Sequence, residues 1–193
     1  YQAGRHAEGE RYAALGAERH PRDYDLLNIH GVLLRKLSRQ AEAVRVLEAA
    51  VRLNSKAVSA QNNLGNVLLD LGEWAKGEAI FAKLVRAEPR NAELQRQLGR
   101  ALVRLGKTDA GIVRLRQATS LKRDFVDGWL DLAGTLSDEK SNDQGLAALD
   151  KALEANPGNP RLLEGKVKLL RRDGRMSEAE ALLSAAVAAD DNA

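Results

Sequence analysis

The sequence has 193 residues, of which 44% are hydrophobic, with 30 basic and 27 acidic side chains and no cysteine. The apolar content is ample for a folded chain, and the lack of cysteine excludes disulfide scaffolds, thiol chemistry and thiolate metal sites. No apolar run approaches the roughly 20 residues of a membrane-spanning helix, so we expect no membrane partner. The lack of cysteine leaves the compartment open; we expect the cytoplasm, with the periplasm as the alternative.

The sequence repeats itself at an interval of 34 residues. One slot of the repeat always holds leucine, and another holds only glycine or alanine. The leucines are Leu34, Leu68, Leu102, Leu136 and Leu170, and the small residues are Gly9, Ala43, Gly77, Gly111, Gly145 and Ala179. A period of this size is typical of a solenoid, in which each unit buries its apolar face against its neighbours.

In chain order, residues 1–23 are predicted to form the second helix of a truncated repeat. Five repeats follow in one continuous solenoid domain, at 24–57, 58–91, 92–125, 126–159 and 160–193. The final residue is also the last slot of a repeat, and the only methionine lies far inside the chain. We therefore expect this sequence to be a segment of a longer bacterial protein.

Each repeat is predicted to form two helices joined by a tight turn. In the second repeat, apolar residues at spacings of three and four give one face to a helix over 58–71 and another to a helix from about 75 to 87. Gly72 supplies the left-handed backbone that ends the first helix. The corresponding stop residues elsewhere are Gly4, Ser38, Gly106 and Gly174.

Gly77 stands in the middle of a predicted helix, where glycine costs about 1 kcal/mol relative to alanine. We expect this slot to mark the closest crossing of two helices, where a larger side chain would hold them apart. The alternative is that alanine would serve equally well.

This pattern resembles the tetratricopeptide repeat (TPR) family. The second repeat carries it best, with Leu64, Gly65, Leu68, Gly72, Trp74, Gly77, Phe81 and Pro89, and the fourth adds Trp129, Leu132, Ala133, Ala152 and Pro157. The resemblance implies an all-α fold, a right-handed α-solenoid of helix-turn-helix repeats whose first helices line a concave groove. Lys140 replaces the turn glycine of the fourth repeat, and Lys166 and Val167 replace the Leu-Gly pair of the fifth, so these two repeats should be less regular.

The resemblance also implies a non-catalytic protein-interaction module that binds a partner segment in the groove. Groove slots of the family fall on residues that we take as candidate binding residues: Asn28, Arg35, Asn62, Asn63, Asn66, Asp70, Arg96, Gln97, Arg100, Arg104 and Asp131. The alternative function is an assembly or oligomerisation scaffold that makes contacts through its exposed ends.

Charge is distributed unevenly between the third and fourth repeats. The third has eight basic and three acidic residues, and the fourth has two basic and seven acidic. Arg96, Arg100 and Arg104 form one stripe along a helix. The stripe either binds an acidic partner segment or pairs with Asp127 and Asp131 on the next first helix.

The stretch Asn62–Asn66 is similar to repeats of the O-linked N-acetylglucosamine transferase type, whose groove asparagines hold a peptide backbone. An asparagine amide suits that role because it offers both a donor and an acceptor. The alternative is an ordinary solvated polar face. Such arrays in bacteria are often joined to a glycosyltransferase or sulfotransferase domain, which implies substrate recruitment. Repeats that bind the acidic C-termini of heat-shock chaperones hold two carboxylates with a set of Lys, Asn and Arg side chains. Only Asn63 of this chain matches that set.

The sequence offers no catalytic, metal-binding or cofactor-binding site. Residues 101–108 match a relaxed phosphate-loop pattern, but they lie within a predicted helix and its turn rather than after a strand. The three histidines form no ligand pair at helical spacing, and His30 occupies a slot otherwise held by leucine, so we expect a packed core imidazole. Acidic neighbours and scarce aromatic residues argue against nucleic-acid binding.

The last predicted helix is rich in alanine and apolar residues. Ala181, Leu182, Ala185, Val187, Ala188 and Ala189 leave little polar surface on it. Since a terminal repeat needs a polar outer face, we expect this helix to be covered by a further repeat or domain, or by self-association.

Overall fold

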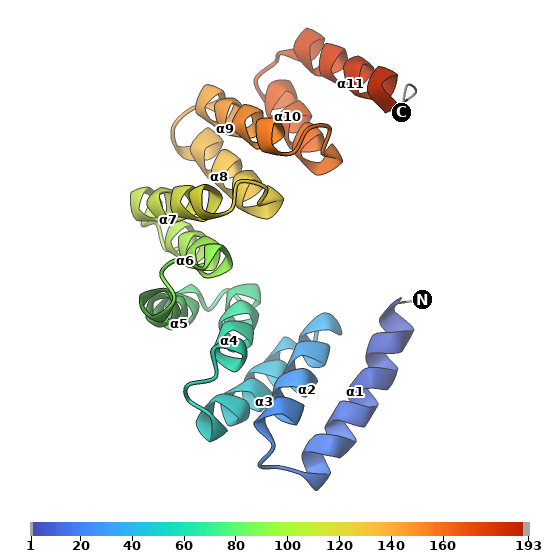
Figure 1. Cartoon of the computed structure of the whole chain (residues 1–193), viewed down its shortest axis with the longest axis vertical. Helices are drawn as coiled ribbons and strands as arrows, with labels where there is room; N and C mark the ends of the chain where they lie inside the picture. Colours follow the sequence, from blue (N-terminus) through green and yellow to red (C-terminus); the bar gives the residue numbers. More distant parts are fainter. Residues whose placement is uncertain (1, 191–193) are drawn as a thin grey trace. The chain divides into compact units, whose positions relative to one another are not determined.

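The computed structural model describes the backbone of residues 2–190 and the side chains of residues 5–188. Within this range every regular element is an α-helix (Figure 1). The helices are α1 (Gln2–Arg19), α2 (Tyr24–Lys36), α3 (Gln40–Leu53), α4 (Val58–Asp70), α5 (Trp74–Ala87), α6 (Ala92–Arg104), α7 (Thr108–Leu121), α8 (Val126–Glu139), α9 (Asn142–Ala155), α10 (Pro160–Arg172) and α11 (Met176–Asp190). The predicted fold class, an all-α solenoid of helical repeats, is confirmed.

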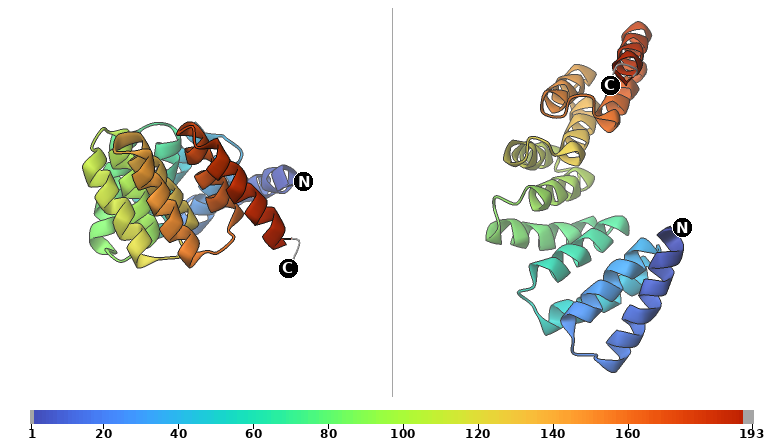
Figure 2. Two further views of the ribbon diagram at one scale, coloured as in Figure 1. Left: turned by 90° about the horizontal axis from the view of Figure 1, so that it is seen from above. Right: turned by 45° about the vertical axis from the view of Figure 1, so that its right-hand side comes forward.

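The helices belong to two compact units, one extending to Pro89 and the other beginning at Arg90. Within each unit, consecutive helices pack side by side in chain order (Figure 1 and Figure 2). The even-numbered first helices also touch one another, α2 with α4, α6 with α8 and α8 with α10. Within either unit, and over the described residues, the backbones of odd-numbered second helices do not approach one another as closely. Each unit therefore has an inner layer of first helices and an outer layer of second helices.

The recurring leucine is buried in every complete repeat. The exposed fractions are 1% for Leu34, 6% for Leu68, 7% for Leu102, 4% for Leu136 and 2% for Leu170. The glycine three residues before Leu68 makes room for a second-helix side chain, because a Cβ atom on Gly65 would lie 2.8 Å from the Phe81 ring. Phe81 is completely buried as a result.

Most of the predicted helix stops have the left-handed backbone that the sequence suggested. The φ angles are 59° at Ser38, 78° at Gly72, 73° at Gly106 and 75° at Gly174. The prediction for Gly4 is wrong, because α1 extends through it. A glycine inside a helix lowers helix stability by only about 1 kcal/mol relative to alanine. Gly4 therefore does not end the helix, because the chain does not turn there.

The fourth repeat departs from the others at its turn, as expected. Lys140 has a φ of −119° rather than a positive value, and α8 has 14 residues where α6 has 13. Ser141 then caps α9 by accepting a hydrogen bond from the Gln144 amide. The expected irregularity of the fifth repeat is not seen in helix length, because α10 keeps 13 residues and buries Val167.

Candidate partner-binding surfaces

The predicted binding residues lie on the first helices, and we call their polar surface the first-helix face. It has one part in each unit. Residues three and four apart share a face of a helix, which is why Arg96, Arg100 and Arg104 line up along α6. The candidates Asn62, Asn63 and Asn66 belong to α4 of the first unit, and the arginine stripe belongs to α6 of the second. The structure therefore places them in separate units.

Arg96 is held inside a network of the second unit. Its Nε atom donates a hydrogen bond to Asp131 Oδ2 at 2.6 Å, and its Nη1 atom lies 3.3 Å from Glu93 Oε1. The guanidinium lies 5.7 Å from the centre of the Phe125 ring, within the range of a cation–π interaction. The side chain is only 15% exposed, so Arg96 holds adjacent repeats together and is little exposed to a partner.

Arg100 shares the carboxylate that Arg96 uses. Its Nε atom lies 3.7 Å from Asp131 Oδ2, and its Nη1 atom donates to Gln97 Oε1 at 3.0 Å. Gln97 in turn donates to Glu93 Oε1 at 2.6 Å, and is 5% exposed. Arg100 is 39% exposed, and Arg104 is exposed one turn further along α6. These two arginines are the part of the stripe that a partner can reach.

Two further ion pairs extend this network through the second unit. Arg161 Nη2 donates to Asp127 Oδ1 at 2.5 Å, and Arg172 Nη1 donates to Asp138 Oδ1 at 2.5 Å. The candidate binding residues did not include these four, although the sequence had suggested Asp127 as a partner of the arginine stripe. Opposite charges one repeat apart are the signal that identifies all four.

The first unit has the same kind of pairing. Asn63 Nδ2 donates to Asn28 Oδ1 at 2.8 Å, and Arg35 Nε donates to Asp70 Oδ2 at 2.5 Å. Four of the predicted binding residues thus bond to each other between α2 and α4.

Asn62 and Asn66 complete the first unit's part of the face. Both are half-buried. The Asn62 Oδ1 atom is buried and has no hydrogen-bond partner among the described residues. A buried amide oxygen without a partner destabilises the fold by about 1–3 kcal/mol. A peptide N–H can bond to this atom and remove the penalty only after the side chain turns outward.

The hydrogen bonds that join successive first helices share one geometric rule. Each joins residues 34 or 35 positions apart, that is, equivalent or neighbouring slots of successive repeats. The interpretation that Asp127 and Asp131 pair with the arginine stripe is therefore correct for Arg96. Exposed pairs of this kind stabilise by roughly 0–1 kcal/mol each, so they can exchange for contacts to another polypeptide.

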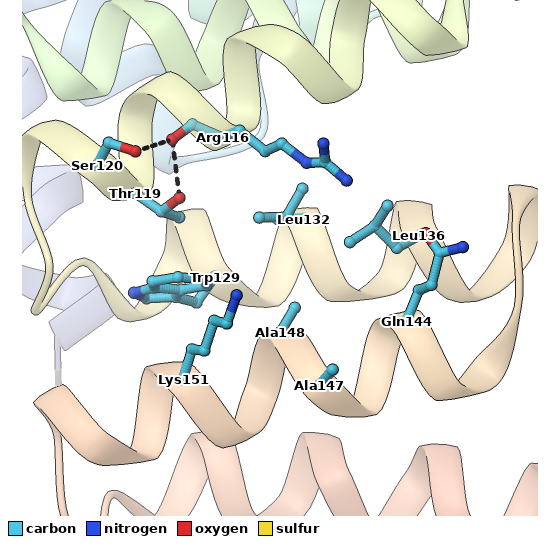
Figure 3. Close-up of a pocket in the computed structure, with 10 residues that line it drawn as sticks. All are labelled: Arg116, Thr119, Ser120, Trp129, Leu132, Leu136, Gln144, Ala147, Ala148 and Lys151. Atoms are coloured by element: carbon cyan, nitrogen blue, oxygen red, sulfur yellow. Dashed lines mark hydrogen bonds between the residues drawn. The ribbon is translucent and has the colours of Figure 1, made fainter.

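A cleft lies on the opposite side of α8 in the second unit, and we call it the α7–α9 cleft. Its volume is about 480 Å³. The walls come from α7 and α9, and the floor comes from Trp129, Leu132 and Leu136 of α8 (Figure 3). The sequence pattern does not predict this site, because the cleft depends on the spacing between two second helices.

The described residues hold no group of three or more His, Asp or Glu side chains that could bind a metal ion. His30 is packed at 14% exposure, and its Nε2 atom also lies 3.1 Å from Glu10 Oε1. Glu10 lies 3.1 Å from Arg39 Nη1 as well, which makes His30 part of a polar cluster rather than a purely apolar core. No helix in the described part of the chain is both long and apolar enough to span a membrane.

The chain is built from repeated helix pairs, and side-chain hydrogen bonds join successive first helices within each unit. This architecture defines an α-solenoid repeat protein. Residues 28–92 and 62–118 match one tetratricopeptide repeat description, and residues 136–193 match a second. Together the matches span well over half of the chain, which belongs to the tetratricopeptide repeat family. A search of curated protein sequences finds no match.

Several solved structures are similar to this chain. A tetratricopeptide repeat protein from Parabacteroides merdae ATCC 43184 has a TM-score of 0.77 at 18% identity, covering 96% of this chain and 73% of its own. MamA 41-end from Desulfovibrio magneticus RS-1 has a TM-score of 0.74 at 21% identity, covering 82% and 90%. YrrB, described as a TPR protein with an unusual peptide-binding site, has a TM-score of 0.62 at 21% identity, covering 91% and 90%. At these identities the likeness shows the fold.

Proposed function

We propose that the chain is a non-catalytic protein-interaction module whose first-helix face binds a segment of a partner protein. The observation that carries the proposal is the carboxylate shared in the second unit. Asp131 lies next to both Arg96 and Arg100, and Arg96 also has Glu93 and Asp127 beside it. Arg100 therefore has only a share of one carboxylate, at 3.7 Å. Arg100, which is 39% exposed, keeps donors for an acidic side chain of the partner, and Arg104 extends this basic surface.

In the first unit, the asparagines of α4 hold the backbone of the partner segment. Asn63 uses its amide N–H on Asn28, which leaves its own oxygen as an acceptor for a peptide N–H. Turning the Asn62 side chain outward would make its unpartnered oxygen a second acceptor. The peptide-binding site ascribed to the similar protein YrrB supports this kind of role.

In the proposed biological setting, the bound segment belongs to a protein substrate. The module presents it to a glycosyltransferase or sulfotransferase domain of the same bacterial protein. This part rests on the similarity of Asn62–Asn66 to transferase-linked repeats, and the open reading frame on both sides of the segment tests it. A full reading frame without a transferase domain would contradict recruitment and leave the binding proposal intact.

The test of binding uses peptides selected on the wild-type chain from a displayed random library. Arg100→Gln with Arg104→Gln should weaken acidic peptides by about tenfold, equivalent to about 1.4 kcal/mol, as measured by fluorescence anisotropy. Arg96 is left unchanged, because its removal would break a half-buried network and confuse binding with folding.

The matched control is Lys107→Gln with Arg114→Gln. It removes the same charge from the second unit at positions outside the first-helix face. It should bind as the wild type does. The proposal fails if the selected peptides bind both variants as tightly as the wild type, at low as well as physiological salt.

Exposed apolar residues favour a second candidate function, an assembly scaffold that makes contacts through its outermost helices. Tyr12 is 69% and Leu15 43% exposed on α1, and Leu183 is 41% and Val187 62% exposed on α11. Large apolar side chains grouped on one surface are typical of protein contact sites.

A further inference from the structure

The α7–α9 cleft has an apolar interior whose polar atoms are already satisfied. The Trp129 indole N–H donates to the Arg123 carbonyl oxygen at 2.7 Å. The Thr119 and Ser120 hydroxyls donate to the Arg116 carbonyl oxygen at 3.0 and 2.8 Å (Figure 3). The interior therefore favours an apolar side chain as ligand, since no buried donor in it needs a partner.

The mouth of the cleft carries two cationic side chains. Arg116 extends from α7 above Leu132, and Lys151 extends from α9 beside Trp129 (Figure 3). Both are exposed, and over residues 5–188 neither side chain forms an ion pair or a hydrogen bond. Arg96 on the first-helix face is different, because its charge is compensated by Asp131.

Acidic side chains nearby do not compensate these two charges. None of the ten residues that line the cleft is acidic. Two of the three acidic residues of α9 bond elsewhere, Asp143 to Arg175 at 3.2 Å and Asp150 to Lys166 at 2.5 Å. The mouth of the cleft is thus a local positive surface above an apolar floor.

We propose that the α7–α9 cleft is a second binding site, which takes an acidic segment of a partner protein. A bulky apolar side chain of that segment lies on Trp129 and Leu132, and carboxylates beside it pair with Arg116 and Lys151. A cleft of about 480 Å³ accommodates one or two such side chains. This site is separate from the first-helix face, so each can fail without the other.

The experiment uses Trp129 as its own reporter. The chain has two tryptophans, so Trp74→Phe leaves Trp129 as the source of tryptophan fluorescence. The probe is a short peptide with one leucine between glutamates, and the control peptide has glutamine at each glutamate position. The glutamate peptide should shift Trp129 emission and bind about tenfold more tightly than the glutamine peptide, with the difference shrinking at high salt.

Two charge-matched variants assign the binding to the cleft. Arg116→Ala with Lys151→Ala should weaken the glutamate peptide by about tenfold or more. Lys107→Ala with Arg114→Ala removes equal charge from the second unit outside both proposed sites and should leave this binding unchanged. Circular dichroism of each variant checks that the helices remain folded.

Three results would overturn the proposal. One is that no glutamate peptide changes Trp129 emission at millimolar concentration. Another is that the two variants lose binding equally, which would indicate general charge attraction. The third is a Trp129 signal that changes with protein concentration alone, which would show a second copy of the chain in the cleft.

Discussion

At the scale of single residues, the small slot of the second helices is set by what its Cβ atom would touch. A Cβ atom on Gly145 would lie 2.7 Å from the Ala133 carbonyl oxygen and 2.8 Å from Ser137 Cβ. On Gly9 it would meet only the Leu33 side chain, at 3.7 Å. Glycine itself is needed where the backbone of the facing helix is the neighbour, and alanine would suffice at Gly9. A Cβ atom on Gly77 would clash with Leu69 Cδ2, so the leucine side chain would have to move.

This difference predicts that a glycine-to-alanine substitution changes the free energy of unfolding in opposite directions at Gly145 and Gly9. Gly145→Ala should destabilise the second unit by about 1–3 kcal/mol, because α8 and α9 must move apart. Gly9→Ala should be neutral or stabilise by up to about 1 kcal/mol through helix propensity. Urea unfolding followed by circular dichroism measures both. Equal effects would show that the slot is not a site of close backbone approach.

At the scale of helices and turns, the end of each first helix depends on the sign of φ. Ser38 has a φ of 59°, a conformation in which a residue with a Cβ atom is strained. Lys140 occupies the equivalent slot of the fourth repeat with a φ of −119°. The same slot therefore has two backbone conformations, and only one of them favours glycine.

Glycine should accordingly stabilise one turn and destabilise the other. Ser38→Gly should raise the free energy of unfolding by about 0.5–1 kcal/mol, because glycine relieves the left-handed strain. Lys140→Gly should lower it, since glycine adds entropy to the unfolded chain and removes the bond from Lys140 Nζ to Asp109 Oδ1. Thermal unfolding of the two variants checks the prediction, which is contradicted if both shift the midpoint in the same direction.

The hydrogen bond from Lys140 Nζ to Asp109 Oδ1 also affects the ionisation of Asp109. The hydrogen bond and the positive charge of Lys140 lower the pKa of the Asp109 carboxyl. This contact joins α7 to the end of α8, so it links the basic third repeat to the acidic fourth. Its acid belongs to the basic repeat and its base to the acidic repeat, whereas the Arg96–Asp131 bond joins the majority charges of the two repeats.

At the scale of the whole molecule, the chain contains two compact units that meet in sequence at Pro89 and Arg90. Each has its own buried cluster, around Leu34 and Leu47 in the first and around Leu115 and Leu149 in the second. Burial within a repeat array comes from neighbouring repeats. The outermost helices α1 and α11 have a neighbour on one side only among the described residues, which leaves their apolar side chains exposed.

The scaffold function predicts association through α11. Wild-type chain should show mass that rises with concentration in light scattering, and Leu183→Gln with Val187→Gln should abolish the rise, because burial of these apolar groups drives the contact. Val113→Gln is the matched control, since Val113 is an equally exposed apolar residue of α7, at 60%. A wild-type chain that stays monomeric, or a double variant that still associates, would exclude this function for α11.

The sequence by itself determined the helix pairs, the buried leucines and most of the turns. These features depend on local rules, since residues three and four apart share a helix face and a positive φ ends a helix. It also identified the arginine stripe and the asparagines. It left open whether the arginines bind a partner or pair with Asp127 and Asp131, and whether the asparagines bind a peptide or form a solvated polar face.

Only the tertiary structure decided which side chains of different helices meet. It showed that Arg96 pairs with Asp131, that Asn63 pairs with Asn28, and that Gly145 but not Gly9 faces a backbone carbonyl. It also showed a cleft between α7 and α9 with two uncompensated cations. Each of these facts depends on which side chains of different helices meet, and the distances between them follow from the packing of helices rather than from the order of residues along one helix.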